Sequence, residues 1–310
     1  MGEFQQQLLA LLGSIVCLVF VVKCIRFLRY FFPRLWTTLP RSFFQSMGDW
    51  AVITGSGDGI GRAYAFELAK RGLNIVLISR TLEKLQKVAS EIEQTTGKKV
   101  KTIQADFTKK NIYDDIEESL QGLEIGVLVN NVGTLPDRLP CRFLNMPDKD
   151  QDLLNCNILS LTKMTRIILK QMVPRQKGIV LNLSSAVGTF PCPLFAIYSA
   201  SKAFVYTFSR ALQMEYKAKG MIIQAVTPFA VSTPMTMWMK PSLFTKTAEE
   251  FARESLEYVT FGAETFGCLA HEILARFMQC IPLWVFESDR VQERLKDRIS
   301  GSMMKCLKST

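Results

Sequence analysis

Short runs of apolar residues alternate along the chain with longer stretches in which apolar positions recur every three to four residues. Most of the short runs are rich in Val, Ile and Leu, and each is followed by a polar residue, a glycine or a proline. Runs of this length are typical of strands that are buried on both faces of a parallel sheet. We therefore expect strands at 51–54, 74–79, 100–105, 125–130, 178–183 and 221–227.

The longer stretches have the helical period, and they separate one expected strand from the next. We expect helices at 60–71, 83–95, 112–120, 152–173 and 198–219. Strands that alternate with helices predict an α/β fold, here a doubly wound parallel sheet of the Rossmann-like kind in a single domain. The stretch that runs from 228 to about 260 follows the last strand. It is where a lid over a substrate is expected.

A different pattern opens the chain, because residues 8–22 are apolar and carry no charge. Fifteen helical residues measure about 22 Å, and the residues on either side lengthen the segment toward the ~30 Å of a bilayer core. No basic residue precedes Lys23, whereas a cleaved signal peptide begins with positive charge. The five basic residues at 23–41 predict that the following chain is cytosolic. A hydrophobic helix lying in the membrane interface is the alternative.

Composition and charge exclude several classes of protein. Apolar residues make up 48% of the chain and charged residues 21%, which excludes a disordered chain. The net charge of +10 is concentrated near the two ends, so we expect no nucleic-acid partner. The eight cysteines form no CxxC pair and His271 is the single histidine, so we expect reduced thiols and no metal site.

The first expected strand leads into a glycine-rich turn, TGSGDGIG at 54–61. Gly55, Gly59 and Gly61 allow a tight turn and a close approach of the backbone to a pyrophosphate at the start of a helix. A glycine turn without a ligand is the alternative. The second strand ends at Ser79-Arg80 without the carboxylate that would bind the ribose of NAD. The guanidinium of Arg80 can instead pair with a 2′-phosphate, which favours NADP(H) over NAD(H).

Tyr198 and Lys202 are four residues apart in an expected helix, so both side chains lie on one face. An ammonium at this position can lower the pKa of the phenol, which then donates a proton to a carbonyl at neutral pH. The pair Tyr206 and Arg210 has the same spacing, so the spacing by itself is weak evidence.

These motifs gain specificity when they are taken together. The glycine-rich turn, Asn130-Asn-Val-Gly133, Asn157, Ser185 and the Tyr198–Lys202 pair follow one another as in the short-chain dehydrogenase/reductase family, which residues 48–280 resemble. The resemblance implies that Tyr198 is the general acid and that Ser185 steadies the substrate carbonyl. It implies that Lys202 binds the nicotinamide ribose, with a water relay supported by Asn157. The implied cofactor contacts are Gly55, Gly59, Ile60, Gly61, Ser79, Arg80, Asp106, Asn131, Tyr198, Lys202, Val231 and Thr233.

Two positions depart from the family pattern, Val132 in place of alanine and Phe229 in place of glycine. The resemblance also divides the chain. It implies a membrane anchor and basic linker at 1–47, a catalytic domain at 48–280 that includes the lid, and a C-terminal tail at 281–310.

Within the family, the segments at 47–85, 103–109, 123–133, 198–204 and 211–220 resemble the microsomal ketosteroid reductases. That resemblance implies NADPH-driven reduction of androstenedione to testosterone at the endoplasmic reticulum membrane, with the catalytic domain facing the cytosol, and it allows a homodimer. The lid is apolar, with Phe229, Met235, Met237, Trp238, Met239, Leu243 and Phe244.

Two alternatives stay open. A microsomal very-long-chain 3-oxoacyl-CoA reductase shares the fold, the catalytic residues and the cofactor, although it carries a C-terminal lysine pair that this tail lacks. A membrane-attached NADP-binding scaffold is the alternative without catalysis, and the intact Ser185, Tyr198 and Lys202 set argues against it.

Overall fold

The computed structural model describes residues 2–31, 39–40, 42–137, 141–190, 192–294, 297 and 301. The chain divides into two compact units, Met1–Leu39 and Pro40–Thr310. The predicted basic linker lies partly outside the described residues, and so does the end of the tail with its two lysines.

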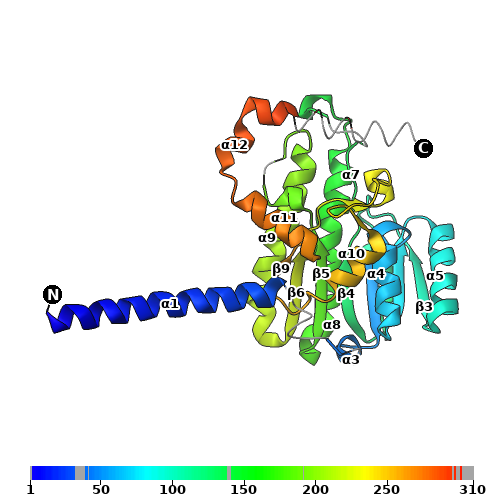
Figure 1. Cartoon of the computed structure of the whole chain (residues 1–310). Helices are drawn as coiled ribbons and strands as arrows, with labels where there is room; N and C mark the ends of the chain where they lie inside the picture. The colour runs from blue at the N-terminus through cyan, green and yellow to red at the C-terminus, as the bar shows by residue number, and fades with distance from the viewer. Residues whose placement is uncertain are drawn as a thin grey trace. The chain divides into compact units, whose positions relative to one another are not determined.

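The second unit is built on a seven-stranded parallel sheet in the order β3-β2-β1-β4-β5-β6-β9 (Figure 1). Its strands are β1 Trp50–Thr54, β2 Asn74–Ser79, β3 Val100–Gln104, β4 Ile125–Asn130, β5 Gly178–Leu183, β6 Met221–Val226 and β9 Glu264–Thr265. The six predicted strands are confirmed to within one residue at each end, and β9 was not predicted. A separate two-stranded sheet joins β7 Val231–Ser232 to β8 Lys246–Thr247.

Helices cover the sheet on both sides. The helices that follow β1 along the chain are α4 Gly59–Lys70, α5 Leu82–Thr96, α6 Tyr113–Ser119, α7 Asp150–Leu154, α8 Ser160–Arg175, α9 Ala196–Tyr216, α10 Ala248–Ser255, α11 Leu269–Gln279 and α12 Leu283–Glu287. One apolar core joins β1, β2, β4, β5 and β6 to side chains of α6, α8 and α9. α4 and α5 pack on β1, β2 and β3, and α10 packs on α4; the doubly wound topology places them on the other face. The predicted fold class is therefore confirmed.

The helix predicted at 152–173 is interrupted. A π-helical turn at Asn155–Leu159 separates α7 from α8 and buries Asn155, Cys156 and Asn157. Such turns occur frequently at functional sites, because they rotate side chains out of the regular helical register. Here the turn brings Cys156 to the wall of the cleft described below.

A short helix, α3 Ser42–Gln45, precedes β1. Phe44 is buried, and the side chain of Gln45 donates a hydrogen bond to the carbonyl of Gly72 (3.1 Å). At the other end of the unit, the ring of Phe286 in α12 stacks on Phe190, with 6.0 Å between the ring centres. Segments near both ends of the second unit thus pack against its body.

The first unit contains one long helix, α1 Glu3–Phe31. The segment Glu3–Ile25 has a mean hydropathy of 2.7, and none of its residues is buried inside the molecule. By length and composition this helix can cross a membrane. The predicted N-terminal hydrophobic helix is confirmed, and it is compatible with attachment to a membrane.

Candidate active site

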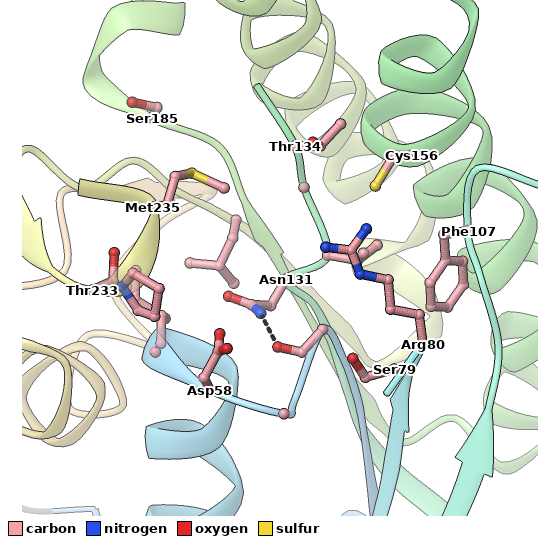
Figure 2. Close-up of a pocket in the computed structure, with 18 of the residues that line it drawn as sticks. Asp58, Ser79, Arg80, Phe107, Asn131, Thr134, Cys156, Ser185, Thr233 and Met235 are labelled. Carbon is pink, nitrogen blue, oxygen red and sulfur yellow. Dashed lines mark hydrogen bonds between the residues drawn. The ribbon is translucent and has the colours of Figure 1, made fainter. Parts of the chain in front are cut away.

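A cleft of about 350 Å³ lies beyond the carboxyl ends of the strands (Figure 2). Twelve of the fourteen site residues predicted from the sequence line it: Gly55, Gly59, Ile60, Ser79, Arg80, Asp106, Asn131, Ser185, Tyr198, Lys202, Val231 and Thr233. The other two, Gly61 and Asn157, lie outside the lining. The fold therefore brings together residues that are up to 178 positions apart in the sequence, from Gly55 to Thr233.

The turn between β1 and α4 and the first residues of α4 line the cleft, and this part of the chain requires glycine. Gly55 has a φ of +66°, and a Cβ at Gly61 would overlap the carbonyl oxygen of Gly55 and approach Asn131 Nδ2 to 2.5 Å. No side chain fits at Gly61, although this residue does not itself line the cleft. The compact turn leaves the first N–H groups of α4 available to an anion.

Asn131 holds this turn in place. Its Nδ2 donates hydrogen bonds to the carbonyls of Thr54 and Gly55, both at 3.0 Å. Thr54 Oγ1 in return accepts from the backbone N–H groups of Asn131 (3.0 Å) and Val132 (3.1 Å). Asn131 thus braces the turn through its side chain, in addition to lining the cleft.

Ser79 and Arg80 lie on one side of the cleft, where β2 ends. The guanidinium of Arg80 points into the cleft beside Phe107 (Figure 2). Asp106, which follows β3, also lines this side, and its Oδ1 accepts hydrogen bonds from the backbone N–H (3.1 Å) and hydroxyl (2.9 Å) of Thr108. This side of the cleft therefore contains the guanidinium of Arg80 and the carboxylate of Asp106, which is hydrogen-bonded to Thr108.

Tyr198 and Lys202 enter the cleft from one face of α9, as their spacing predicts. The side chains of Ser185 and Tyr198 are hydrogen-bonded to each other. Lys202 is buried; its Nζ donates to the carbonyl of Leu183 (2.9 Å) and lies 5.7 Å from the centre of the Tyr198 ring. Three side chains with exchangeable protons are therefore adjacent.

The pKa of Tyr198 is shifted in the direction opposite to the one that the sequence predicts. Burial raises the pKa of Tyr198 to about 12, and the hydrogen bond with Ser185 only partly opposes this rise. Burial also lowers the pKa of Lys202 to about 8. The ammonium was expected to lower the pKa of the phenol; instead it is directed to the Leu183 carbonyl, and burial determines the direction of the shift.

Asn157 lies behind Lys202 rather than in the cleft. Its Oδ1 accepts from the N–H of Thr134 (2.8 Å), and its Nδ2 donates to the Thr134 carbonyl (3.1 Å) and to Ser201 Oγ (3.0 Å). A Cβ added at Gly133 would lie 3.3 Å from Lys202 Nζ and 3.5 Å from Asn157 Oδ1. Asn157 therefore joins the segment after β4 to α9, and its part in a water relay stays a prediction.

Thr233 and Met235 lie on the side opposite Arg80 (Figure 2), and Val231 also lines the cleft. The N–H of Thr233 donates to Thr236 Oγ1 (3.0 Å), which in turn donates to the carbonyl of Val231 (2.6 Å). These bonds fix a short turn at the start of the lid. Further along the lid, Trp238 and Leu243 are exposed at 59% and 71% of their surface.

The structure adds lining residues that the sequence interpretation did not select. Among them are Asp58, Thr81, Lys84, Phe107, Thr134 and Cys156. Asp58 belongs to the glycine-rich turn, and Lys84 comes four residues after Arg80 in the sequence, so both could have been found from the motifs. The position of Cys156 in the cleft depends on the π-helical turn, for which the sequence has no signal.

Among the described residues, no cluster of His, Cys, Asp and Glu could hold a metal ion.

Residues 49–242 match the model of the short chain dehydrogenase family, so the chain belongs to this family and is an oxidoreductase that acts on CH–OH groups. It is similar to human 17-beta-hydroxysteroid dehydrogenase type 3, with 61% identity over 295 residues and 95% of each chain covered. A very-long-chain 3-oxoacyl-CoA reductase from Anas platyrhynchos is 49% identical over 240 residues, which are 76% of this chain and 77% of that protein.

Among solved structures, the short-chain dehydrogenase from Sphingobium yanoikuyae in complex with NADPH is similar, with a TM-score of 0.65 and 26% identity. The match covers 75% of this chain and 96% of that one. The family predicted from the motifs is thus confirmed independently by sequence and by fold.

Proposed function

We propose that this chain is an NADPH-dependent 17-ketosteroid reductase that chiefly converts androstenedione to testosterone. The similarity to 17-beta-hydroxysteroid dehydrogenase type 3 carries this proposal, because it extends over 95% of the chain at 61% identity. The similarity to the 3-oxoacyl-CoA reductase is weaker, and it covers only 76% of the chain.

The lining of the cleft fits NADP(H). The glycine turn and the first N–H groups of α4 suit a pyrophosphate. Arg80 points into the cleft where β2 ends, and no carboxylate stands at the end of that strand to repel a 2′-phosphate. The solved relative from Sphingobium yanoikuyae binds NADPH, which supports the same choice. When bound, NADPH supplies the hydride for the reduction.

The chain itself supplies the proton. Ser185 and Tyr198 share a hydrogen bond, so two hydroxyl groups are presented together to a substrate carbonyl. The raised pKa of Tyr198 keeps its proton on the phenol at neutral pH, until charge develops on the carbonyl oxygen. Lys202, with a pKa of about 8, can then return a proton to the phenolate.

The lid favours an uncharged substrate. Met235, Trp238, Leu243 and Phe244 are large apolar side chains that are at least partly exposed. Lys246 forms an ion pair with Glu254 (3.1 Å), so its charge is already balanced. A polycyclic ketone needs few polar partners when it is buried, whereas the phosphates of an acyl-CoA need several cations.

We also propose that α1 anchors the enzyme in the endoplasmic reticulum membrane, with the catalytic domain on the cytosolic side. The segment Glu3–Ile25 is long and apolar enough to cross a bilayer, and basic residues follow it. A homodimer, which the family resemblance allows, stays a prediction.

Product analysis tests the proposed function. Membranes that contain the chain are incubated with NADPH and either a series of ketosteroids or a 3-oxoacyl-CoA, and membranes with the Tyr198→Phe variant give the background. We expect testosterone from androstenedione, with slower turnover of the acyl-CoA. Faster turnover of the acyl-CoA than of every 17-ketosteroid would establish the elongation-type alternative. Retained NADPH binding without turnover of any compound would establish the scaffold.

A further inference from the structure

Two cations line the end of the cleft at which β2 finishes, although the motifs select only one of them. Arg80 directly follows β2, and Lys84 lies on the first turn of α5. A Cβ at Gly57 would lie 3.4 Å from Lys84 Cβ and 3.5 Å from Ser79 Oγ. The stem of Lys84 therefore adjoins the glycine-rich turn beside Ser79. Among the described residues that line the cleft, Lys202 is the third with a basic side chain, and it is buried in the first half of α9.

The ammonium of Lys84 is paired with a carboxylate of the same turn. Lys84 Nζ lies 2.7 Å from Asp58 Oδ2, and the two side chains are exposed over 56% and 46% of their surface. Asp58 occupies the N-cap position of α4, but its side chain makes no capping hydrogen bond. Its carboxylate is thus directed to Lys84, and the pair lines the cleft where negative phosphates would bind.

We propose that Lys84 is a second cationic ligand of the 2′-phosphate of NADP(H) and that it exchanges Asp58 for this phosphate when the cofactor binds. This inference rests on the proposed use of NADP(H). The exchange is favourable because an exposed ion pair contributes little to stability, whereas a phosphate dianion is a strong acceptor of charge-assisted hydrogen bonds. Asp58 is half exposed, so water can solvate its carboxylate after the exchange.

The two cations differ in what they contribute. The planar guanidinium of Arg80 can bind two phosphate oxygens at fixed angles, whereas Lys84 adds a point charge on a flexible stem. When Lys84 is absent, the unbalanced charge of Asp58 weakens binding of the 2′-phosphate. Lys84 therefore acts on the preference between NADP(H) and NAD(H), not on the chemical step.

Equilibrium binding tests this role independently of activity. The full-length chain in detergent is titrated with NADP⁺ and with NAD⁺, and the quenching of its tryptophan fluorescence reports the two dissociation constants. In the Lys84→Met variant, which keeps the length of the stem, we expect about a five-fold or greater loss of NADP⁺ affinity. NAD⁺ affinity should change by less than about two-fold, because NAD⁺ has no 2′-phosphate.

The matched control is Lys87→Met, which removes the same charge one turn further along α5. Lys87 does not line this cleft, so both cofactors should respond equally to its loss. The inference is overturned if Lys84→Met and Lys87→Met give the same ratio of NADP⁺ to NAD⁺ affinity.

Asp58→Asn tests the exchange of partners. This variant frees Lys84, so the preference for NADP⁺ over NAD⁺ should rise, and adding Lys84→Met should cancel the rise. An unchanged preference in Asp58→Asn would show that Asp58 does not compete for Lys84.

A failure of the inference differs from a failure of the proposed function. If the unmodified chain binds NAD⁺ as tightly as NADP⁺, the proposed cofactor is wrong. If the unmodified chain prefers NADP⁺ and Arg80→Gln removes this preference, while Lys84→Met leaves it intact, only the role of Lys84 is wrong.

Discussion

In the proposed mechanism Tyr198 donates the proton to the substrate carbonyl, and its surroundings keep that proton on the phenol. Burial raises the pKa of the phenol to about 12, so the group is protonated throughout the neutral range. The neighbouring Lys202 has a pKa of about 8 and lies 5.7 Å from the ring centre. The pair therefore combines a weakly acidic phenol with an ammonium that can reprotonate it, which suits a donor that acts only when an alkoxide begins to form.

Tyr198→Phe removes this proton donor and little volume. We expect the rate of ketone reduction to fall by about a hundred-fold or more, which is the usual contribution of general acid catalysis. NADPH binding should be largely retained, because the other residues that line the cleft are unchanged. Initial rates and a fluorescence titration with NADPH measure the two effects. A variant that keeps more than about a tenth of the wild-type rate would remove Tyr198 from the acid role.

Arg80→Gln removes the guanidinium that points into the cleft at the end of β2. A hydrogen bond to a charged group contributes about 1.5–3 kcal/mol, so the KM for NADPH should rise about ten-fold or more. The KM for NADH should change little, since it has no 2′-phosphate. Steady-state kinetics with each cofactor provide the comparison. Equal increases for both would mean that Arg80 does not bind the phosphate.

The sequence predicts such residues well where a local motif determines them. Tyr198 and Lys202 are brought together by one helix, and Gly55 and Gly61 by one turn. No local motif determines the Asp58–Lys84 ion pair, because it joins the turn before α4 to helix α5. The direction predicted from the sequence for the pKa shift of Tyr198 was also wrong. The burial that raises this pKa depends on the whole fold, whereas the spacing of Tyr198 and Lys202 is a local property.

At the scale of elements, the apolar runs predict five of the six long strands because those five are buried on both faces. The sixth, β3, lies at the edge of the sheet and is only partly buried. β9 was missed because its two residues are too few for a periodic pattern. The π-helical turn at Asn155–Leu159 leaves the apolar pattern of the surrounding helices intact, so it has no sequence signal. Helix α10, in contrast, has a sequence signal. Thr247 and Glu250 form a capping box at its start, and their three-residue spacing is visible in the sequence.

The lid is joined to the elements around it by His271 of α11. The N–H of Phe229, after β6, donates to His271 Nδ1 (3.3 Å), so the neutral ring carries its proton on Nε2. Nε2 then donates to the carbonyl of Phe244 in the lid (3.1 Å). The ring is fully buried between Phe229 and Phe251. Only the neutral tautomer with a free Nδ1 satisfies both bonds.

This geometry predicts loss of stability in mild acid. Burial, assisted by nearby Lys246, lowers the pKa of His271 below its usual 6.5. Below pH 6.5 the unfolded chain binds the proton more readily than the folded one, so stability falls as pH falls, by at most about 1.4 kcal/mol per pH unit. Above pH 6.5 this dependence is absent. Thermal unfolding of the chain in detergent between pH 8 and pH 5 measures the effect.

His271→Gln is the control for this prediction. It keeps a donor and an acceptor but cannot be protonated, so the decline between pH 6.5 and pH 5 should be shallower than in the unmodified chain. The midpoint at pH 8 should itself be lower, because the amide fills the buried site less well. Parallel profiles for the two proteins would assign the acid sensitivity to other groups.

At the scale of the whole molecule, the distribution of charge bears on the proposed orientation of the chain in the membrane. The apolar segment Glu3–Ile25 has its acidic residue at the start and Lys23 near its end, and further basic residues follow. Basic residues are retained on the cytosolic side of a membrane. The catalytic domain would then have access to the reducing NADPH pool, which drives a ketone toward the alcohol.

This arrangement predicts that a protease added outside sealed microsomes degrades the catalytic domain. An antibody against an epitope after residue 48 follows the loss of the full-length chain, and a lumenal protein that resists digestion until detergent is added reports sealed vesicles. Removal of residues 2–25 should release much of the chain from the membrane, because it removes the apolar segment that is long enough to span the bilayer. A catalytic domain that is protected without detergent and digested only after its addition would place it in the lumen, opposite to the orientation that the basic residues predict.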